Sequence, residues 1–505
     1  MENGTRTRRA TLASLVATLT GVAAVACGGE AAPAAKAPEP TKAPAAAPTA
    51  AKPAEPTKAP AAQPTTAPAA AQSGGAKTLP DAKIAWETFR GGDGTWPELM
   101  IKTFKEKFPN VTVEYRPIVL DNNNQQSAYP KMLAAAQAGT LGDLHAWDPS
   151  HWQMYPAAKR KIIMPVDDLI ARDKYDLGQF YKPFIDYQKW QGKTWGLPSW
   201  GWTGQDGFLY NTQLLEAAGV KMPDPKSADW TMAKFYDLIV QVGKYMQKTN
   251  GFGLWTSLPS STGTTAFTRA FNGDKFSEDG KKATLMDPAA KEAMRWAYDL
   301  ANKEKVVAHA ENMPKDISAD QMFVNGQIAI THQGSLGVFT MNKLNKDGAL
   351  KFQSVLFPKR KDGKRPSELR GGTWNLNATS KAPDQTWEFL KHIVSKDGAL
   401  SFNTMSGNQA NVRPDIMKDK YFSDPNFQNY LENFEQAMVH VIPANLRGIE
   451  LDPVFAEKGN PWYFGKVGFE DGLKTWNDEL QRILDQPLAP PREELVRLVS
   501  LLHSK

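Results

Sequence analysis

The chain has 505 residues, which is too long for one compact core, so two or more folded lobes are expected. Its composition is that of a globular protein, 41% hydrophobic and 10% aromatic, with 15 tryptophans. The formal net charge of +6 comes without a dense cluster of lysine or arginine, which argues against a nucleic-acid-binding face.

The start of the chain has the pattern of an export signal. Arg6, Arg8 and Arg9 form a positively charged beginning, and residues 10–26 are apolar or small and carry no charge. This run is short for a membrane span and lacks a stop-transfer flank. Residues 1–26 are therefore predicted to be a signal peptide, and the pattern leaves open whether export is general or twin-arginine dependent.

The single cysteine, Cys27, directly follows the apolar run, so an intrachain disulfide is impossible. The stretch Ala24-Val25-Ala26-Cys27 resembles a bacterial lipobox, although that motif usually has leucine where Ala24 stands. The resemblance implies that Cys27 becomes the acylated first residue of the mature protein. Because each buried CH₂ contributes about 0.8 kcal/mol, two or more acyl chains would anchor the protein stably. A plain signal peptide is the alternative.

Residues 27–80 are almost entirely Ala, Pro, Thr, Lys, Glu and Gln, and EPTKAPAA occurs at both 39–46 and 55–62. This segment has no apolar periodicity and cannot form a core, so it is predicted to be a disordered linker. Frequent proline favours extended spacing of about 3.1 Å per residue, which gives a reach on the order of 100 Å. We interpret the segment as a tether and assign no site to it.

From Lys83 onward, predicted strands and helices alternate. KIAWETF (83–89) and NVTVEYRPIV (110–119) alternate like strands, and PELMIKTFKEKF (97–108) between them has helical spacing. This strand–helix–strand opening predicts an α/β fold. Further amphipathic helices are predicted at 231–249, 288–305 and 384–405, and further strands at 351–358 and 372–380.

Five segments resemble, in order, the motif blocks of one family. They are KIAWETF with FKEKFPNVTVEY, YPKMLAAAQAGTLGDLHAWDPSHW, IIMPVDDLI, QGKTWGLPSWGWTGQDGFLYNTQLLEAAGV and FVNGQIAITHQGS. The chain resembles the extracellular solute-binding proteins of ABC importers, in the sugar-binding branch that includes maltose-binding protein, over most of residues 83–480. It departs from the family pattern at Val166, Trp195 and Ile330, where the family has Leu, Tyr and Met.

The resemblance implies two α/β lobes joined by crossing strands, with the ligand in the cleft between them. The expected boundaries are 83–200 with 355–402 for the first lobe and 203–354 with 403–490 for the second. Ligand would close the hinge, a transition known for periplasmic binding proteins. The closed form would be recognised by an ABC permease, and the protein is expected to be a monomer that leaves its carbohydrate ligand chemically unchanged.

The stretch WGLPSWGWTGQDGFLYN (195–211) would form the first crossing beside the cleft. Aromatic rings pack on the apolar faces of a sugar, and polar groups bond its rim. Trp200 and Trp202 are two residues apart and would share one face of a regular strand, and Gln205 and Asp206 could bond the rim. The alternative is that the rings fill core and the polar residues lie in a solvated loop.

Other ligand-binding candidates follow strands, because such loops line clefts in α/β sheets. They are Thr88, Arg90 and Asp93 after the first strand, Trp147, Asp148 and Ser150 after GDLHAW, Gly372 and Trp374 in GGTWN, and the late Trp462. Solvated turns and helix packing are the alternatives for these residues. His145 and His151 are interpreted as ordinary structural or surface histidines. The hydroxyl-rich segment WTSLPSSTGTTAF (255–267) is predicted to line the second lobe, with Trp255 and Thr264 as candidates.

Motifs of enzymes are missing from the sequence. No HExxH, CxxC, GxSxG or P-loop pattern occurs, and no catalytic residue, metal site or cofactor is predicted. A glycoside hydrolase would need two carboxylates at a defined separation, and no motif pairs Glu87, Asp148 and Asp206. The sequence therefore predicts a membrane-tethered carbohydrate receptor outside the cytoplasm, in the periplasm or on the cell surface. The same fold binding a peptide, polyamine or organic anion stays open as an alternative.

Overall fold

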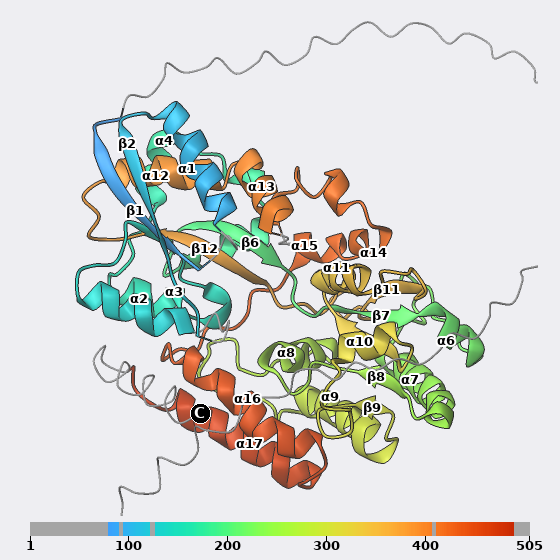
Figure 1. Cartoon of the computed structure of the whole chain (residues 1–505). Coiled ribbons are helices and arrows are strands. Elements are labelled where there is room, and N and C mark those ends of the chain that lie inside the picture. Colours follow the sequence, from blue (N-terminus) through green and yellow to red (C-terminus); the bar gives the residue numbers. More distant parts are fainter. Residues whose placement is uncertain (1–78, 90–93, 122–126, 407–410, 489–505) are drawn as a thin grey trace, which may run out of the picture. The chain divides into compact units, whose positions relative to one another are not determined.

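The computed structural model describes residues 79–89, 94–121, 127–406 and 411–488 (Figure 1). The predicted signal peptide, Cys27, most of the predicted linker, Arg90 and Asp93 lie outside these residues. The described residues belong to the unit that follows the linker.

The first of two five-stranded sheets has the strand order β2-β1-β3-β12-β6. Its strands are β1 (Ala82–Thr88), β2 (Val111–Pro117), β3 (Leu144–His145), β6 (Leu197–Trp202) and β12 (Arg370–Leu376). β1 pairs in parallel with β2 and β3, and β12 runs antiparallel to both β3 and β6. The predicted strand–helix–strand opening is confirmed, and with it the α/β class.

The second sheet has the order β11-β7-β10-β8-β9. Its strands are β7 (Gly207–Asn211), β8 (Phe252–Trp255), β9 (Val307–Ala308), β10 (Ile328–Gln333) and β11 (Phe352–Leu356). β7 is antiparallel to its neighbours β10 and β11, whereas β8 is parallel to β9 and β10. A separate hairpin joins β4 (Lys189–Trp190) to β5 (Lys193–Thr194).

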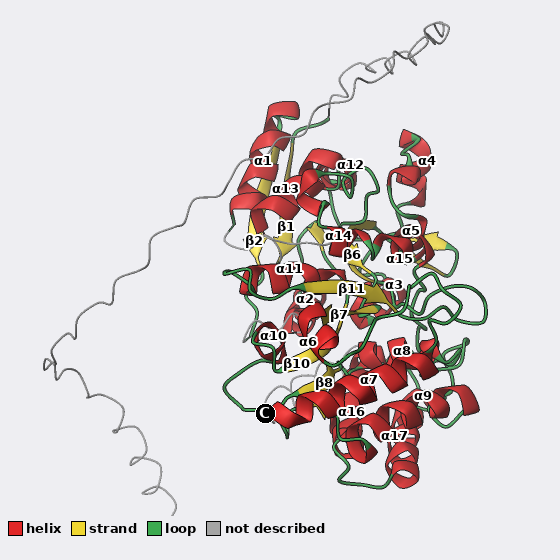
Figure 2. Cartoon of the chain, turned by 90° about the vertical axis from the view of Figure 1, so that its right-hand side faces the viewer, coloured by secondary structure: helices red, strands yellow, loops and turns green. Residues whose placement is uncertain are grey.

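Helices cover both sheets (Figure 2). The α-helices are α1 (Thr95–Lys107), α2 (Ala128–Gln137), α3 (Met154–Lys159), α4 (Asp167–Asp173), α5 (Lys182–Asp186), α6 (Thr212–Ala217), α7 (Met232–Met246), α8 (Ser261–Ala270), α9 (Pro288–Tyr298), α10 (Ala319–Val324), α11 (Ser335–Leu344), α12 (Pro383–Ile393), α13 (Lys396–Ser406), α14 (Pro425–Gln428), α15 (Leu431–Gln436), α16 (Gly448–Tyr463) and α17 (Phe469–Leu484). Short 3₁₀ turns are η2 (Pro149–His151), η3 (Leu177–Gln179), η4 (Gln247–Thr249) and η6 (Lys420–Phe422), and η5 (Asp299–Lys303) is a π-helix.

Helix α7 shows how the sequence pattern produces these elements. Its buried residues Phe235, Leu238, Ile239 and Val242 recur at intervals of three and four, so they form one apolar stripe. The hydroxyl of Thr231 accepts a hydrogen bond from the Lys234 N–H and thereby satisfies an otherwise unpaired donor at the helix start. The stripe packs against β8 and β10.

The long helix predicted at 384–405 is wrong, because two helices occupy this stretch. α12 ends at Ile393 and α13 begins at Lys396. Ser395 lies between them, and its hydroxyl accepts a hydrogen bond from the Gly398 N–H at 3.2 Å. A serine that caps a new helix competes with continuation of the old one, which the apolar spacing alone does not reveal.

Two chain segments pass from one sheet to the other. Residues 203–206 connect β6 to β7, and residues 357–369 connect β11 to β12. Figure 1 shows β6 and β12 side by side, and their register pairs Arg370 with Trp202. The first sheet therefore takes strands from 82–202 and 370–376, and the second takes strands from 207–356. The lobe boundaries stay a prediction.

Backbone groups approach closely where the first crossing segment passes the end of β10. A Cβ atom added to Gly334 would lie 1.7 Å from the carbonyl oxygen of Gly204. Gly204 has φ +73, and a Cβ atom there would lie 2.7 Å from the carbonyl oxygen of Glu368. The connection between the sheets thus depends on two glycines, one needed for close approach and one for its left-handed conformation as well.

We predict that Gly334→Ala lowers the free energy of unfolding by about 1–3 kcal/mol, because the new methyl group meets backbone atoms that cannot turn away. Gly468→Ala is the control, since a Cβ atom there has no neighbour within 4 Å. Gly468 is the N-cap of α17, where glycine is favoured over alanine, so the change should cost less than about 1 kcal/mol. Urea denaturation measures both values, and equal stability of the two variants would contradict the prediction.

Candidate functional site

A cavity of about 420 Å³ lies where the first crossing strand, η2, α8 and α16 meet. Its volume is within the range of about 300–1,000 Å³ that is usual for small-molecule sites. The lining residues are Ser150, His151, Trp202, Ser260, Ser261, Thr262, Arg370, Asp452, Pro453, Phe455 and Ala456. They come from segments that are up to about 300 residues apart in the sequence, so the cavity is a product of the tertiary fold.

The aromatic wall of the cavity is Trp202 on β6. Trp200 stacks on it with ring centroids 4.7 Å apart and an angle of 15° between the ring planes. The two rings share one side of β6, as the period of a strand predicts. Trp200 is buried and Trp202 is half-buried, so Trp200 supports one face of the outer ring from within.

Arg370 on β12 joins two walls of the cavity. One terminal nitrogen, Nη1, donates to the carbonyl oxygen of Ser150 at 2.6 Å, and the other, Nη2, donates to the hydroxyl of Thr262 on α8. Ser150 is fastened to the same strand, because its hydroxyl donates to the carbonyl oxygen of Gly371 at 2.8 Å. Arg370 therefore holds η2 and the beginning of α8 at fixed positions around the cavity.

Three hydroxyl groups at the beginning of α8 face the cavity. Ser260 caps the helix, and its oxygen accepts from the Gly263 N–H at 3.1 Å. The oxygen of Ser261 accepts from the Lys275 ammonium at 2.7 Å, and that of Thr262 accepts from Arg370. Each oxygen serves as an acceptor for the protein, and its own O–H can still donate to a guest molecule.

The opposite wall is formed by α16. Among the described residues that line the cavity, Asp452 carries the one carboxylate, and its Oδ2 lies 3.4 Å from Nδ1 of His151. Burial alone would raise the pKa of Asp452, but the hydrogen bond from His151 and nearby positive charges lower it. This wall therefore presents a carboxylate acceptor opposite the hydroxyl donors of α8, with the apolar ring of Phe455 beside it.

Of the predicted ligand-binding residues, the structure brings Ser150 and Trp202 to the cavity, with Trp200 directly behind. Three other predicted tryptophans lie in cores. Trp147 packs edge-on against Tyr129, and Trp462 packs against Tyr298 and Trp476. Trp374 packs against Trp86 and Trp96. These three rings are at most 2% exposed, and their ligand roles stay predictions.

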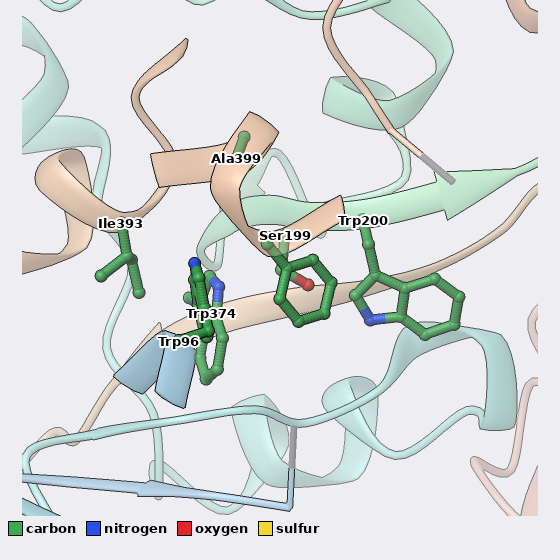
Figure 3. Close-up of a pocket in the computed structure, with 7 residues that line it drawn as sticks. Trp96, Ser199, Trp200, Trp374, Ile393 and Ala399 are labelled. Carbon is green, nitrogen blue, oxygen red and sulfur yellow. The ribbon is translucent and has the colours of Figure 1, made fainter. Parts of the chain in front are cut away.

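Trp200 and Trp374 also line a narrow gap between the first sheet and the helices α1, α12 and α13 (Figure 3). Trp96 lies nearly parallel to Trp374, with ring centroids 6.5 Å apart. The other labelled residues of its lining are Ser199, Ile393 and Ala399. The gap is too narrow to hold a water molecule. We therefore regard it as a packing gap and not as a ligand site.

The remaining predicted residues that the structure describes pack or form hydrogen bonds within the protein and do not line the cavity. Thr88 is buried at the end of β1, and Gly372 lies opposite Trp200 in the pairing of β12 with β6. The Asp148 carboxylate accepts from the Ser150 N–H at 3.1 Å and caps η2. The carbonyl oxygen of Gln205 accepts from His332 at 2.8 Å. Asp148 thus shapes the cavity indirectly through Ser150.

Asp206 lies in the crossing segment between the sheets and is fully buried. Its Oδ2 accepts a hydrogen bond at 2.6 Å from the side-chain amide of Asn433, which lies in α15. Burial raises the pKa of the Asp206 carboxyl to about 7, although the hydrogen bond from Asn433 acts in the opposite direction. The carboxyl is therefore a titratable group inside the segment that connects the two sheets.

Several lining residues escaped the sequence analysis. His151 was interpreted as an ordinary histidine, and Arg370, Asp452 and Phe455 were not selected. Ser260, Ser261 and Thr262 lie in the hydroxyl-rich segment that was predicted to line the second lobe, although Trp255 and Thr264 were the candidates named there. The serine run before a helix was a usable signal, because serine is a preferred helix cap. Arg370 and Asp452 had no local signal.

A second groove of about 280 Å³ lies beside β1, β2 and α2. Its charged lining residues are paired, since Arg116 lies 3.7 Å from Glu87 and Lys131 lies 2.8 Å from Asp121.

In the part of the chain that the structure describes, no group of acidic, histidine or cysteine side chains could hold a metal ion. No helix within the same residues has the length and apolar character to cross a bilayer.

Two α/β sheets joined by crossing strands, with a mixed polar and aromatic cavity beside the crossing, define a ligand-binding protein. The sequence model of the bacterial extracellular solute-binding proteins matches residues 99–429, which is more than half of the chain. The chain belongs to this family, and the resemblance stated from the sequence motifs is confirmed. Its place in an extracellular family also supports a location outside the cytoplasm.

Solved structures with the same two-lobe fold include proteins from three bacteria. MalE, the sugar-binding protein of Xanthomonas citri, is 15% identical with a TM-score of 0.66, and the match covers 80% of this chain and 97% of that chain. The ABC substrate-binding protein Lmo0181 of Listeria monocytogenes, in complex with cycloalternan, is 18% identical with a TM-score of 0.61, covering 80% and 98%. UgpB of Mycobacterium tuberculosis, in complex with glycerophosphocholine, is 16% identical with a TM-score of 0.65, covering 80% and 99%. At these identities the likeness shows the fold alone.

The buried carboxyl of Asp206 gives a pH-dependent prediction. An aspartate in the unfolded chain titrates near its ordinary pKa of about 3.9, well below the folded value of about 7. Between these pH values the folded state binds more protons than the unfolded state. The contribution of Asp206 to the free energy of unfolding therefore falls as pH rises through this window and is constant above it.

The Asp206→Asn variant lacks this pH-dependent contribution to the free energy of unfolding. The free energy of unfolding of the variant, relative to wild type, should therefore be greater at about pH 8 than at about pH 5. Urea titrations of both proteins at the two pH values measure this difference. An equal variant-to-wild-type difference at both pH values would contradict a raised pKa for Asp206.

Proposed function

We propose that the protein is a membrane-tethered solute-binding receptor that captures a carbohydrate and delivers it to an ABC permease. The bound sugar would occupy the 420 Å³ cavity, with one pyranose face against Trp202. The observation that carries the proposal is the combination of a supported indole face with uncharged hydroxyl donors on one cavity. Sugars need both, because they have apolar C–H faces and polar rims.

The polar groups of the cavity support the same ligand class. The hydroxyls of Ser260, Ser261 and Thr262 can donate to ring and hydroxyl oxygens of a sugar, and Asp452 can accept from its hydroxyl groups. The volume is near the lower end of the usual range, which favours a small saccharide. The Xanthomonas neighbour is a sugar-binding protein and the Listeria neighbour is in complex with cycloalternan, and both share the fold, which points in the same direction.

Ligand capture would proceed by closure of two lobes around this cavity. The proposed lobes are residues 83–200 with 355–402 and residues 203–354 with 403–490, as predicted from the sequence. The contacts of residues 411–417 favour a longer first lobe, because the Val412 carbonyl accepts from Tyr181 and Arg413 donates to Val394. Arg370 would hold both lobes in the closed form through Ser150 and Thr262.

The proposal includes the predicted export signal, acylation of Cys27 and the extended linker as tether. The receptor would act as a monomer on the outer side of the cytoplasmic membrane, without a cofactor. It would not act as an enzyme on its ligand. The carboxylates weighed for a glycoside hydrolase are dispersed: Glu87 lines the second groove, and Asp148 and Asp206 are buried in hydrogen bonds outside the cavity lining.

A second candidate keeps the fold and changes the ligand to an anionic or zwitterionic solute. The observation that favours it is Arg370, whose guanidinium lies in the cavity wall beside the N-terminus of α8. The glycerophosphocholine complex of the Mycobacterium neighbour shows that a protein of this fold can hold such a solute.

Calorimetry with glucose, galactose, maltose and maltotriose tests the proposed function. We expect at least one sugar to bind with a dissociation constant near 1 μM, which corresponds to roughly −8 kcal/mol. Trp202→Ala should weaken that binding roughly tenfold to a hundredfold, because the ring face is lost.

Trp190→Phe is the matched control, since Trp190 is half-buried on β4 and is not among the residues that line the cavity. This variant should bind the sugar like wild type. A wild-type protein that binds none of the sugars, or a Trp202→Ala variant with unchanged affinity, would count against the proposed function.

A further inference from the structure

Arg370 places a full positive charge in the cavity wall, and a neighbouring carboxylate compensates this charge. Its side chain is 7% exposed, and Nη2 lies 3.3 Å from Oε2 of Glu368, two residues earlier on the same segment. Burial alone would lower the pKa of Arg370, but the Glu368 carboxylate raises it, so the guanidinium keeps its charge. The positive charge in the wall is thus matched by a negative charge directly behind it.

Glu368 is itself the centre of a buried network. Its side chain is 1% exposed, and Oε1 accepts from Lys275 at 3.2 Å and from the hydroxyl of Thr265 at 3.3 Å. Burial alone would raise the pKa of Glu368, but the charges of Arg370 and Lys275 hold it well below its ordinary value. Glu368 is therefore a fixed negative charge between two positive ones.

Lys275 has the surroundings of a charged ammonium group. Its Nζ reaches three acceptors: the carbonyl and hydroxyl oxygens of Ser261, at 3.2 and 2.7 Å, and the Glu368 carboxylate at 3.2 Å. The rings of Trp152 and Phe455 lie with their centroids 5.3 Å from the same nitrogen. Burial lowers the pKa of Lys275, and the Glu368 carboxylate acts to raise it. The three acceptors match the three N–H donors of an ammonium, and the ring faces favour a cation.

The charged groups around the cavity therefore carry no net positive charge. Arg370 and Lys275 are positive, and Glu368 and Asp452 are negative. Asp148, buried at the start of η2, adds a further negative charge that acts on Arg370. An anion that enters the cavity loses its hydration, and the hydrogen-bond donors there bring no net positive charge to compensate for that loss. A cation is disfavoured because it lies close to the Arg370 guanidinium.

We infer that Glu368 is a specificity-determining residue, which together with Asp452 offsets the charges of Arg370 and Lys275 and makes the receptor select uncharged over anionic solutes. The inference deepens the proposed function, on which its sugar arm rests. On this inference, Arg370 donates hydrogen bonds that hold Ser150 and Thr262 in place, and it does not bind an anion. The second candidate function, with an anionic solute, is thereby disfavoured.

The test compares wild type with Glu368→Gln in the full chain at low ionic strength, where charge effects are least screened. The probes are inorganic phosphate, and glucose and galactose each paired with the corresponding uronate. Glutamine keeps the shape and an acceptor for Thr265 but removes the negative charge. We expect wild type to bind the neutral sugar at least about tenfold more tightly than its uronate, and Glu368→Gln to reduce or reverse this ratio.

The phosphate arm is independent of sugar binding. Glu368→Gln should gain at least about tenfold in affinity for inorganic phosphate, measured by calorimetry. Glu368→Gln combined with Lys275→Met restores the net charge of wild type and should lose this gain. Asp173→Asn is the control, because it removes a carboxylate of 13% exposure that pairs with Lys391 away from the cavity lining, and it should leave phosphate affinity unchanged.

If Glu368→Gln does not fold, Asp452→Asn tests the same balance from the opposite wall and should also gain phosphate affinity. Unchanged phosphate affinity in every folded variant that lacks one of these carboxylates overturns the inference, whatever the sugar results are. Wild-type protein that prefers a uronate or phosphate also overturns it. Sugar binding that fails while the phosphate gain appears would refute the proposed function and leave the charge balance standing.

Discussion

The pairing of β6 with β12 is the constraint on which the candidate site depends. These strands leave the first sheet toward the two crossing segments, and their register sets Trp202 opposite Arg370. A shift in the pairing between Gly372 and Thr373 marks where the ladder becomes irregular. Because successive side chains alternate sides, a slip of one residue would exchange Trp202 for Gly201 or Thr203 on the cavity side and would separate Arg370 from Ser150 and Thr262.

Local patterns were sufficient for the α/β class. Alternation in KIAWETF and helical spacing in the following segment gave the α/β opening, and the period of a strand gave the shared side of Trp200 and Trp202. The family motifs supplied the class of protein. The cavity was predicted less completely, because its lining depends on contacts that join distant segments. Trp147, Trp374 and Trp462 were sequence candidates like Trp202, and only tertiary packing distinguishes a buried ring from a cavity wall.

Charged residues were the hardest to predict. A sequence does not reveal that Arg370 and Lys275 share Glu368, or that His151 meets Asp452 across about 300 residues. Such pairs make buried charge tolerable, since an unpaired ion in a low-dielectric interior is strongly disfavoured. In the proposed receptor they also leave hydroxyl donors and one indole face as the groups that meet the solute, which is a suitable surface for a neutral guest that must later be released.

The central claim is that a sugar ring binds on Trp202 in the cavity between η2, α8 and α16. A crystal structure of the protein grown with the tightest-binding sugar of the panel tests it most directly. The account predicts a pyranose face against the Trp202 indole, with oxygens within hydrogen-bond distance of the Thr262 hydroxyl and the Asp452 carboxylate. A sugar bound in the groove beside β1 and α2, or anywhere that leaves the Trp202 ring without contact, would contradict it.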